Sequence, residues 1–215
     1  MSLRDLGYRP YEGERLPPSH NVWVLWRYGI SRAWASVLVK LSAFFGWVPG
    51  AIGLIGVGIF FWFSQKGQVE SPAELKPQEW VARLLYGQMW IFATAVSLGA
   101  GSAAVAEDFT YKAFQFYFAK PVTPTQYLVG RVLAVAVLIF ALCFIPTLFL
   151  VLGLTLAAPD SLRLEWASLF FPALVHSVVI ATVMSSASVG VSALSKSRAL
   201  TMSTWILLLL VPHVV

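Results

Sequence analysis

Four stretches of the chain run for more than twenty residues without a charged side chain, and this feature constrains the fold more than any other. They are 41–63, 84–106, 132–158 and 167–194. A helix rising about 1.5 Å per residue needs roughly 20 apolar residues to cross about 30 Å of hydrocarbon, so each stretch can span a bilayer. Unpaired backbone groups cost several kcal/mol each in lipid, which excludes open strands. We therefore expect an all-α membrane protein, a polytopic helical bundle.

The composition agrees with a chain that resides in lipid. Hydrophobic residues make up 58% of the 215 residues, charged residues make up 12%, and the mean hydropathy is +0.74. A soluble domain carries about 25% charged residues. A fifth uncharged stretch, 199–215, has about 17 residues, the lower limit for a span. We expect five apparent spans, with a sixth beyond the end of the sequence.

Basic residues are distributed unevenly between the two sides of such a bundle. Of the 15 Lys and Arg, six precede the first span, three lie between the second and third, and two lie between the fourth and fifth. That side holds eleven and the other side holds four. Because cytoplasmic loops are enriched in Lys and Arg, we expect a multi-pass protein with a cytoplasmic N-terminus. The net charge of +5 then reports orientation, and we expect no nucleic-acid partner.

The N-terminal region differs from the spans. Residues 1–18 are polar and rich in proline, and we expect them to be a cytoplasmic tail before a single transmembrane domain, 19–215. From Trp23 to Trp34, apolar residues recur every three to four positions. This period predicts an amphipathic helix over 19–40 that lies in the membrane interface. The alternative is an extension of the first span, and the tryptophans favour the interface.

Small residues recur at helical spacing in three of the spans. Such faces let helices approach closely, although flexibility or a border of a substrate path are alternatives. The three faces are Gly46, Gly50, Gly53 and Gly56; Ala93, Ser97 and Gly101; and Ala181, Ser185, Ser188 and Ser192.

The segment 107–121, between the second and third spans, carries the most information about function. Tyr111, Phe114 and Phe118 are spaced to share one face of a short helix that Pro121 would end. An aromatic face beside a bilayer can bury itself among lipid headgroups, or it can dock in a groove on a soluble protein. Composition alone leaves both open.

The order of residues in and after this segment is distinctive. It contains Ala106-Glu107-Asp108, Lys112-Ala113, Tyr117, Lys120-Pro121-Val122-Thr123, Tyr127 and Gly130-Arg131. This order resembles the cytoplasmic loop of type-2 ABC exporter permeases, in which an acidic pair closes the second span and a short coupling helix follows.

The resemblance implies a permease subunit of an ATP-driven transporter, an exporter, in a bacterial-type plasma (inner) membrane. Its partners would be two ABC-type ATPase subunits, a second permease copy or homologue, and membrane lipid. ATP and Mg would be bound by the ATPase, because this chain has no Gly-x-x-x-x-Gly-Lys-Ser/Thr loop, and we expect neither a metal nor a cofactor here. The residues that would contact the ATPase are Glu107, Asp108, Tyr111, Lys112, Phe114, Phe118, Lys120 and Pro121.

The acidic pair allows two roles. Glu107 and Asp108 can cap the coupling helix through its dipole, or they can pair with basic groups on the interfacial helix or on the ATPase. We favour capping.

Two other classes of protein stay open. A membrane enzyme could use Ser102 and His176, but residues 99–103, Gly-Ala-Gly-Ser-Ala, lack the Gly-x-Ser-Gly order of intramembrane serine proteases. His176 and His213 could also bind haem or sense protons, because ionisable groups within spans are often functional. A non-transport anchor or assembly subunit is the other class. The single cysteine, Cys143, is expected to pack, and no motif names a transported substrate.

Overall fold

The structure, a computed structural model, describes residues 17, 20–67, 76–118 and 122–210, and this part of the chain contains helices and no strand. In chain order the elements are α1 (His20–Ala33), α2 (Val37–Phe45), α3 (Val48–Gln65), α4 (Pro77–Gly87), η3 (Gln88–Ala93), α5 (Thr94–Val96), η4 (Ser97–Gly101), α6 (Ala106–Thr110), α7 (Phe114–Phe118), α8 (Pro124–Ala157), α9 (Arg163–Ala167), α10 (Phe170–Ser192) and α11 (Arg198–Leu210).

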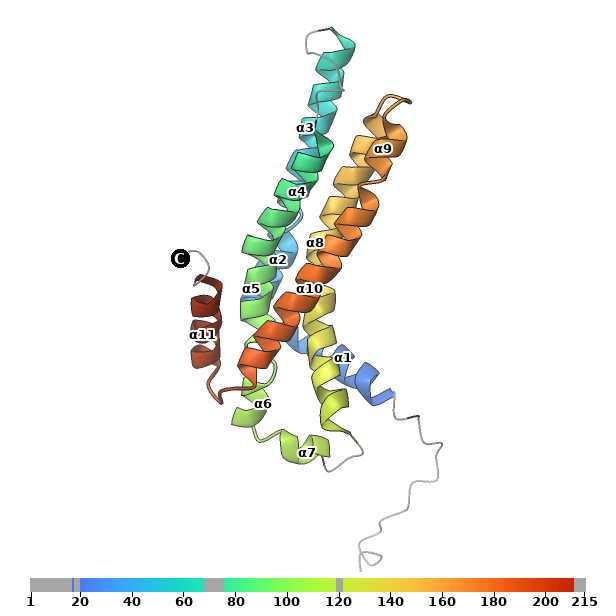
Figure 1. Ribbon diagram of the computed structural model, residues 1–215. Coiled ribbons are helices and arrows are strands. Elements are labelled where there is room, and N and C mark those ends of the chain that lie inside the picture. The colour runs from blue at the N-terminus through green and yellow to red at the C-terminus, as the bar shows by residue number, and fades with distance from the viewer. Residues whose placement is uncertain (1–16, 18–19, 68–75, 119–121, 211–215) are drawn as a thin grey trace, which may run out of the picture.

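Among the described residues, four helical segments are long and apolar enough to cross a membrane: Val37–Gln65, Pro77–Thr110, Pro124–Ala157 and Arg163–Ser192. They run alongside one another as a bundle, with α6 and α7 at one end and α9 at the other (Figure 1). The expected all-α polytopic membrane protein is confirmed. The expected fifth span is represented by α11, whose 13 residues cover about 20 Å, less than the hydrocarbon thickness.

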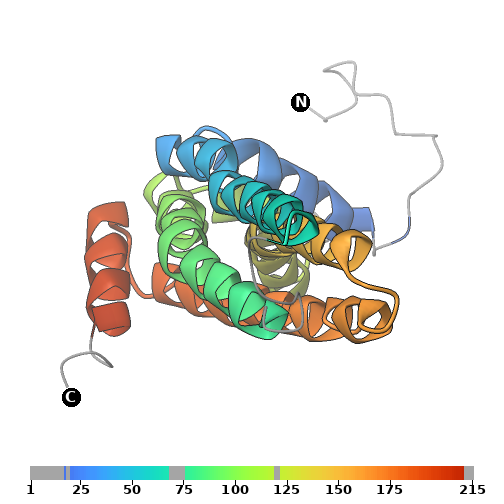
Figure 2. The same ribbon diagram turned by 90° about the horizontal axis from the view of Figure 1, so that it is seen from above.

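The third span, α8, is the central element of the bundle. It packs against α1, α3, α4 and α10, and the view along the bundle shows it enclosed by them, with α11 standing to one side (Figure 2). It begins with a capping box, in which Thr123 and Gln126 each accept from the other's backbone N–H. It then continues for 34 residues through Pro146.

Glycines in the first span allow α3 to approach α8 closely. A Cβ at Gly50 would lie 2.9 Å from the Cβ of Pro146, and a Cβ at Gly53 would lie 3.1 Å from Leu150. Both distances are shorter than ordinary van der Waals contact, so the two helices approach closely where the glycines lie. The glycine face that the sequence predicted as a helix contact is confirmed.

The small-residue faces of the second and fourth spans also meet. A Cβ at Gly101 would clash with the side chain of Ser188 on α10. One turn later, the Ser192 hydroxyl accepts hydrogen bonds from the N–H groups of Val105 (3.0 Å) and Ala106 (2.9 Å) and donates to the carbonyl of Ser102 (2.7 Å). These bonds satisfy backbone groups that the turn between η4 and α6 leaves without helical partners, as burial requires.

The N-terminal helix differs from the expected 19–40. α1 ends at Ala33, and residues from Val37 onward belong to the first candidate span. α1 crosses the lower end of the bundle in Figure 1 and packs on α8, where a Cβ at Gly29 would clash with Ala134. Trp23 in α1 and Trp34, just after its end, are both exposed.

Candidate functional site

The segment that follows the second span forms two short helices rather than one. α6 ends at Thr110, and α7 begins at Phe114. Between them Lys112 has φ of 54°, in the left-handed region that costs a residue with a Cβ about 1–2 kcal/mol and ends a right-handed helix. The expectation that Tyr111 and Phe114 share one helical face is therefore wrong. The turn at Lys112 separates them.

The turn sorts the aromatic side chains into two groups. Phe114 packs inward, with its ring centroid 4.7 Å from that of Phe109 and 5.2 Å from that of Tyr127. Tyr111 is 72% exposed and Phe116 is 75% exposed. The sequence interpretation missed Phe116. Its position two residues after Phe114, on the opposite face of α7, is the signal that could have found it.

Four other residues were predicted to contact the ATPase: Lys112, Phe118, Lys120 and Pro121. Lys112 is exposed in the turn between α6 and α7. Lys120, Pro121 and the side chain of Phe118 lie outside the described residues.

The acidic pair in the first turn of α6 binds arginines. The Glu107 carboxylate accepts from Arg32 at 2.6 Å and from Arg198 at 3.0 Å. The Asp108 carboxylate accepts from Arg32 at 2.7 Å and also from Arg131. Both carboxylates also lie in the first turn of α6, where negative charge interacts favourably with the helix dipole, so the capping expectation is not contradicted. The alternative, pairing with a basic group on the N-terminal helix, is what the structure shows.

These five residues, Arg32, Glu107, Asp108, Arg131 and Arg198, form one arginine–carboxylate cluster. Its arginines come from α1, α8 and α11, and its carboxylates come from α6. Burial lowers the pKa of Arg32, but the hydrogen bonds and negative charges of Glu107 and Asp108 outweigh this effect and raise it. The Arg32 guanidinium therefore stays charged, as arginine does in proteins generally.

Two tyrosines tie the cluster to α7 and to the start of α8. The Tyr127 hydroxyl donates to Asp108 at 2.6 Å. The Arg131 guanidinium donates to the Tyr117 hydroxyl at 3.1 Å, and burial raises the pKa of Tyr117, so this phenol stays neutral. The links fix both short helices to the membrane bundle.

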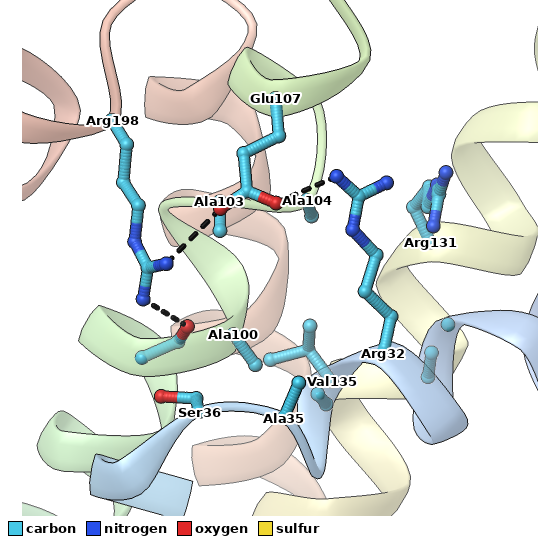
Figure 3. A pocket seen from close by; sticks show the side chains of 14 residues that line it. Arg32, Ala35, Ser36, Ala100, Ala103, Ala104, Glu107, Arg131, Val135 and Arg198 are labelled. Atoms are coloured by element: carbon cyan, nitrogen blue, oxygen red, sulfur yellow. Dashed lines mark hydrogen bonds and ion pairs between the residues drawn. The ribbon is translucent and has the colours of Figure 1, made fainter. Parts of the chain in front are cut away.

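The cluster borders a cavity of about 190 Å³ between α1, η4, α8 and α11. Arg32 and Arg198 reach the Glu107 carboxylate from opposite sides, and Arg198 also donates to the Gly99 carbonyl at 3.2 Å (Figure 3). The rest of the wall is made of small uncharged residues: Gly29, Ala33, Ala35, Ser36, Gly99, Ala100, Ala103, Ala104, Ala134 and Val135.

A second cavity, of about 690 Å³, lies between α4 and α10 toward the other end of the bundle. Its wall is mostly apolar, with Arg83, Tyr86 and His176 among the polar side chains.

The serine and histidine of the enzyme alternative are not brought together. The Ser102 hydroxyl donates to the Leu98 carbonyl, within its own span. Ser188 is the α10 residue next to Gly101, and His176 lies twelve positions before it, about 18 Å along the helix. His213 lies outside the described residues.

A comparison with protein families matches most of the chain. The family model described as ABC-2 family transporter protein matches residues 39–215, which include α6, α7, Arg131 and Arg198 and exclude α1. Searches of curated proteins and of solved structures found no match.

Proposed function

Because the chain belongs to the ABC-2 family of transporter proteins, it is the membrane subunit of an ABC transporter, and we propose that α6 and α7 are its docking site for a separate ATPase. The subunit itself has no phosphate-binding loop in its sequence, so the ATPase supplies ATP binding and hydrolysis, with Mg.

The observation that carries the proposal is the exposure of aromatic side chains on a segment outside the helical spans. Tyr111 and Phe116 present their rings outward from the turn and from α7, while Phe114 anchors α7 by packing on Tyr127. Exposed aromatic side chains rimmed by polar residues are typical of protein interaction sites. The polar neighbours here are Lys112 and Gln115.

The arginine–carboxylate cluster suits such a site because it makes α6 move together with the bundle. Asp108 is bonded to Arg131 on α8 and to Arg32 on α1, and Glu107 is bonded to Arg198 on α11. Removing one partner of a buried ion pair costs about 3–5 kcal/mol. A displacement of α6 by an ATPase is therefore expected to shift three membrane elements instead of breaking the cluster.

The uneven distribution of basic residues supports a cytoplasmic location for this end of the bundle. Eleven Lys and Arg lie on the side of α6 and α7 and four on the other side, so we place the N-terminus and the docking site in the cytoplasm. We further propose an exporter of the inner-membrane type, assembled from two ATPase subunits and two permease subunits, which are one chain in two copies or this chain with a homologue.

Site-specific crosslinking tests the docking site. A photoreactive residue at Phe116 in the full chain, in its native membrane, should form a covalent product with a protein that carries a Gly-x-x-x-x-Gly-Lys-Ser/Thr loop. The matched control is Leu164, which is similarly exposed and lies in α9 at the other end of the bundle. Crosslinking of the ATPase through Leu164 but not Phe116, or through neither, would contradict the proposal and favour a non-transport anchor.

A further inference from the structure

The cavity beside the arginine–carboxylate cluster has more positive than negative charge. Three guanidiniums, of Arg32, Arg131 and Arg198, meet two carboxylates, of Glu107 and Asp108, which leaves one positive charge in excess. The other residues of the wall are uncharged. Arg131 is buried and Arg32 is 24% exposed, so water offsets this excess only in part, and the cavity favours an anion.

A buried donor without an acceptor supports this view. The Arg131 side chain is 1% exposed, and its Nε has no hydrogen-bond partner among the described residues. Buried polar groups nearly always have a partner, and an orphan donor needs an explanation such as an ion. Arg131 borders the cavity, so an anion there can be the missing acceptor.

The size of the cavity suits a small oxyanion. Its 190 Å³ is the volume of about six water molecules at about 30 Å³ each. The alanines and glycines of the wall provide the room, since they extend no long side chain into the space. Guanidinium groups bind phosphate oxygens with two parallel hydrogen bonds, which is the geometry that arginine offers and lysine does not.

The depth of the cavity places it at the level of lipid headgroups. α8 has 34 residues and is about 51 Å long, about 20 Å longer than the hydrocarbon it crosses, so about 10 Å projects at each end. Arg131 lies seven residues from the start of α8, about 10 Å along it. The Arg198 side chain is 42% exposed, so this part of the cavity wall can be reached from outside the bundle.

We propose that this cavity is a binding site for a phosphate group, which the arginines of α1, α8 and α11 hold. The group can belong to an anionic lipid or to free phosphate. Binding there would join α11 and α1 to the helix that carries the docking site. Phosphate binding depends on the charge of the cavity and not on the ATPase contact, so either one can be disproved without the other.

The test measures thermal unfolding of the purified full chain in an uncharged detergent at constant ionic strength. One arm titrates inorganic phosphate, a second titrates dioctanoyl phosphatidic acid, and a third titrates dioctanoylglycerol, which has the same chains without phosphate. A ligand that binds the folded state raises the unfolding midpoint by mass action. We expect the two phosphates to raise it and dioctanoylglycerol to leave it unchanged. The more effective phosphate identifies the source of the group.

Two variants that break the same ion pair separate binding from stability. Arg198→Gln removes a positive charge from the wall. The variant should need at least about tenfold more phosphate for the same rise in the unfolding midpoint, because hydrogen bonds to charged groups are worth about 1.5–3 kcal/mol. Glu107→Gln breaks the same pair but adds to the positive excess, so it should bind phosphate at least as well as the unmodified chain. Arg163→Gln, at the far end of the bundle, controls for net charge.

Three results would overturn the proposal. They are equal weakening by Arg198→Gln and Glu107→Gln, equal stabilisation by dioctanoylglycerol and phosphatidic acid, and no stabilisation by either phosphate.

Discussion

Arg131 of the third span donates a hydrogen bond to Asp108 at the end of the second, and each of the two side chains is only 1% exposed. The pair closes the two ends of the segment that contains α6 and α7. It leaves this segment little freedom to move independently of the spans, because opening it would leave the Arg131 guanidinium buried without a counter-charge.

Removal of the Asp108 charge should destabilise the fold. Asp108→Asn leaves the buried Arg131 guanidinium without a counter-charge, and we expect a loss of about 3–5 kcal/mol, measured as a lower unfolding midpoint in detergent. Glu79→Gln is the control, because Glu79 pairs with Lys76 and Arg83 at the surface, where such pairs contribute about 0–1 kcal/mol. Equal midpoints for the two variants would show that the cluster does not hold the segment.

A methyl group at the contact of α3 and α8 should also destabilise the bundle. Gly50→Ala would place a Cβ 2.9 Å from the Cβ and 3.2 Å from the carbonyl oxygen of Pro146, and we expect a cost of about 1–3 kcal/mol from overpacking. Gly58→Ala, in the same helix, has no atom within 4 Å of the new Cβ and should be neutral or stabilising. Unfolding midpoints of both variants check this. A tolerated Gly50→Ala would mean that the helices separate easily.

Loss of the outward aromatics should uncouple the ATPase. The double variant Tyr111→Ala and Phe116→Ala should lower the stimulation of the partner ATPase by at least about tenfold, because each truncation of a buried aromatic anchor costs about 2 kcal/mol or more in a docked interface. The amount of chain in the membrane should not change, since neither ring packs on the bundle. Activity is measured as ATP hydrolysis in the reconstituted complex.

Phe114→Ala provides the contrast to that double variant. Phe114 packs on Phe109 and Tyr127, so its truncation should lower both the stability of the chain and the stimulation of the ATPase. Full stimulation by the Tyr111 and Phe116 variant would exclude the proposed docking surface.

The orientation of the bundle can be checked by labelling of cysteines. In a Cys143→Ala background, Gln115→Cys should be protected from an impermeant thiol reagent in intact cells, and Ser161→Cys should react. Both positions are exposed, Gln115 in α7 and Ser161 just before α9, and these helices lie at opposite ends of the bundle (Figure 1). Permeabilised cells should allow both to react, which controls for accessibility. The reverse labelling in intact cells would place α6 and α7 outside.

The sequence by itself determined that this protein resides in a bilayer and that its spans are helices. Uncharged runs of helical length leave a backbone in lipid no other solution than helices, so the spans follow from local composition alone. The glycine face of the first span is equally local, because only residues without a side chain permit the contact that Gly50 makes with Pro146. The order of residues from Glu107 to Arg131 likewise sufficed to indicate the family that the comparison then showed.

Only the tertiary structure decided which charges meet and which rings face outward. Arg32 lies 75 positions from Glu107, and Arg198 lies 91 positions from it, so no spacing rule brings them together. Their meeting depends on how α1 and α11 pack against α8 and η4. The place of Glu107 and Asp108 in the first turn of α6 is local, but the arginines that they bind and the Ser192 hydroxyl that bonds Ala106 come from distant helices. Contacts between distant segments are set by the packing of whole helices, which local residue patterns do not contain.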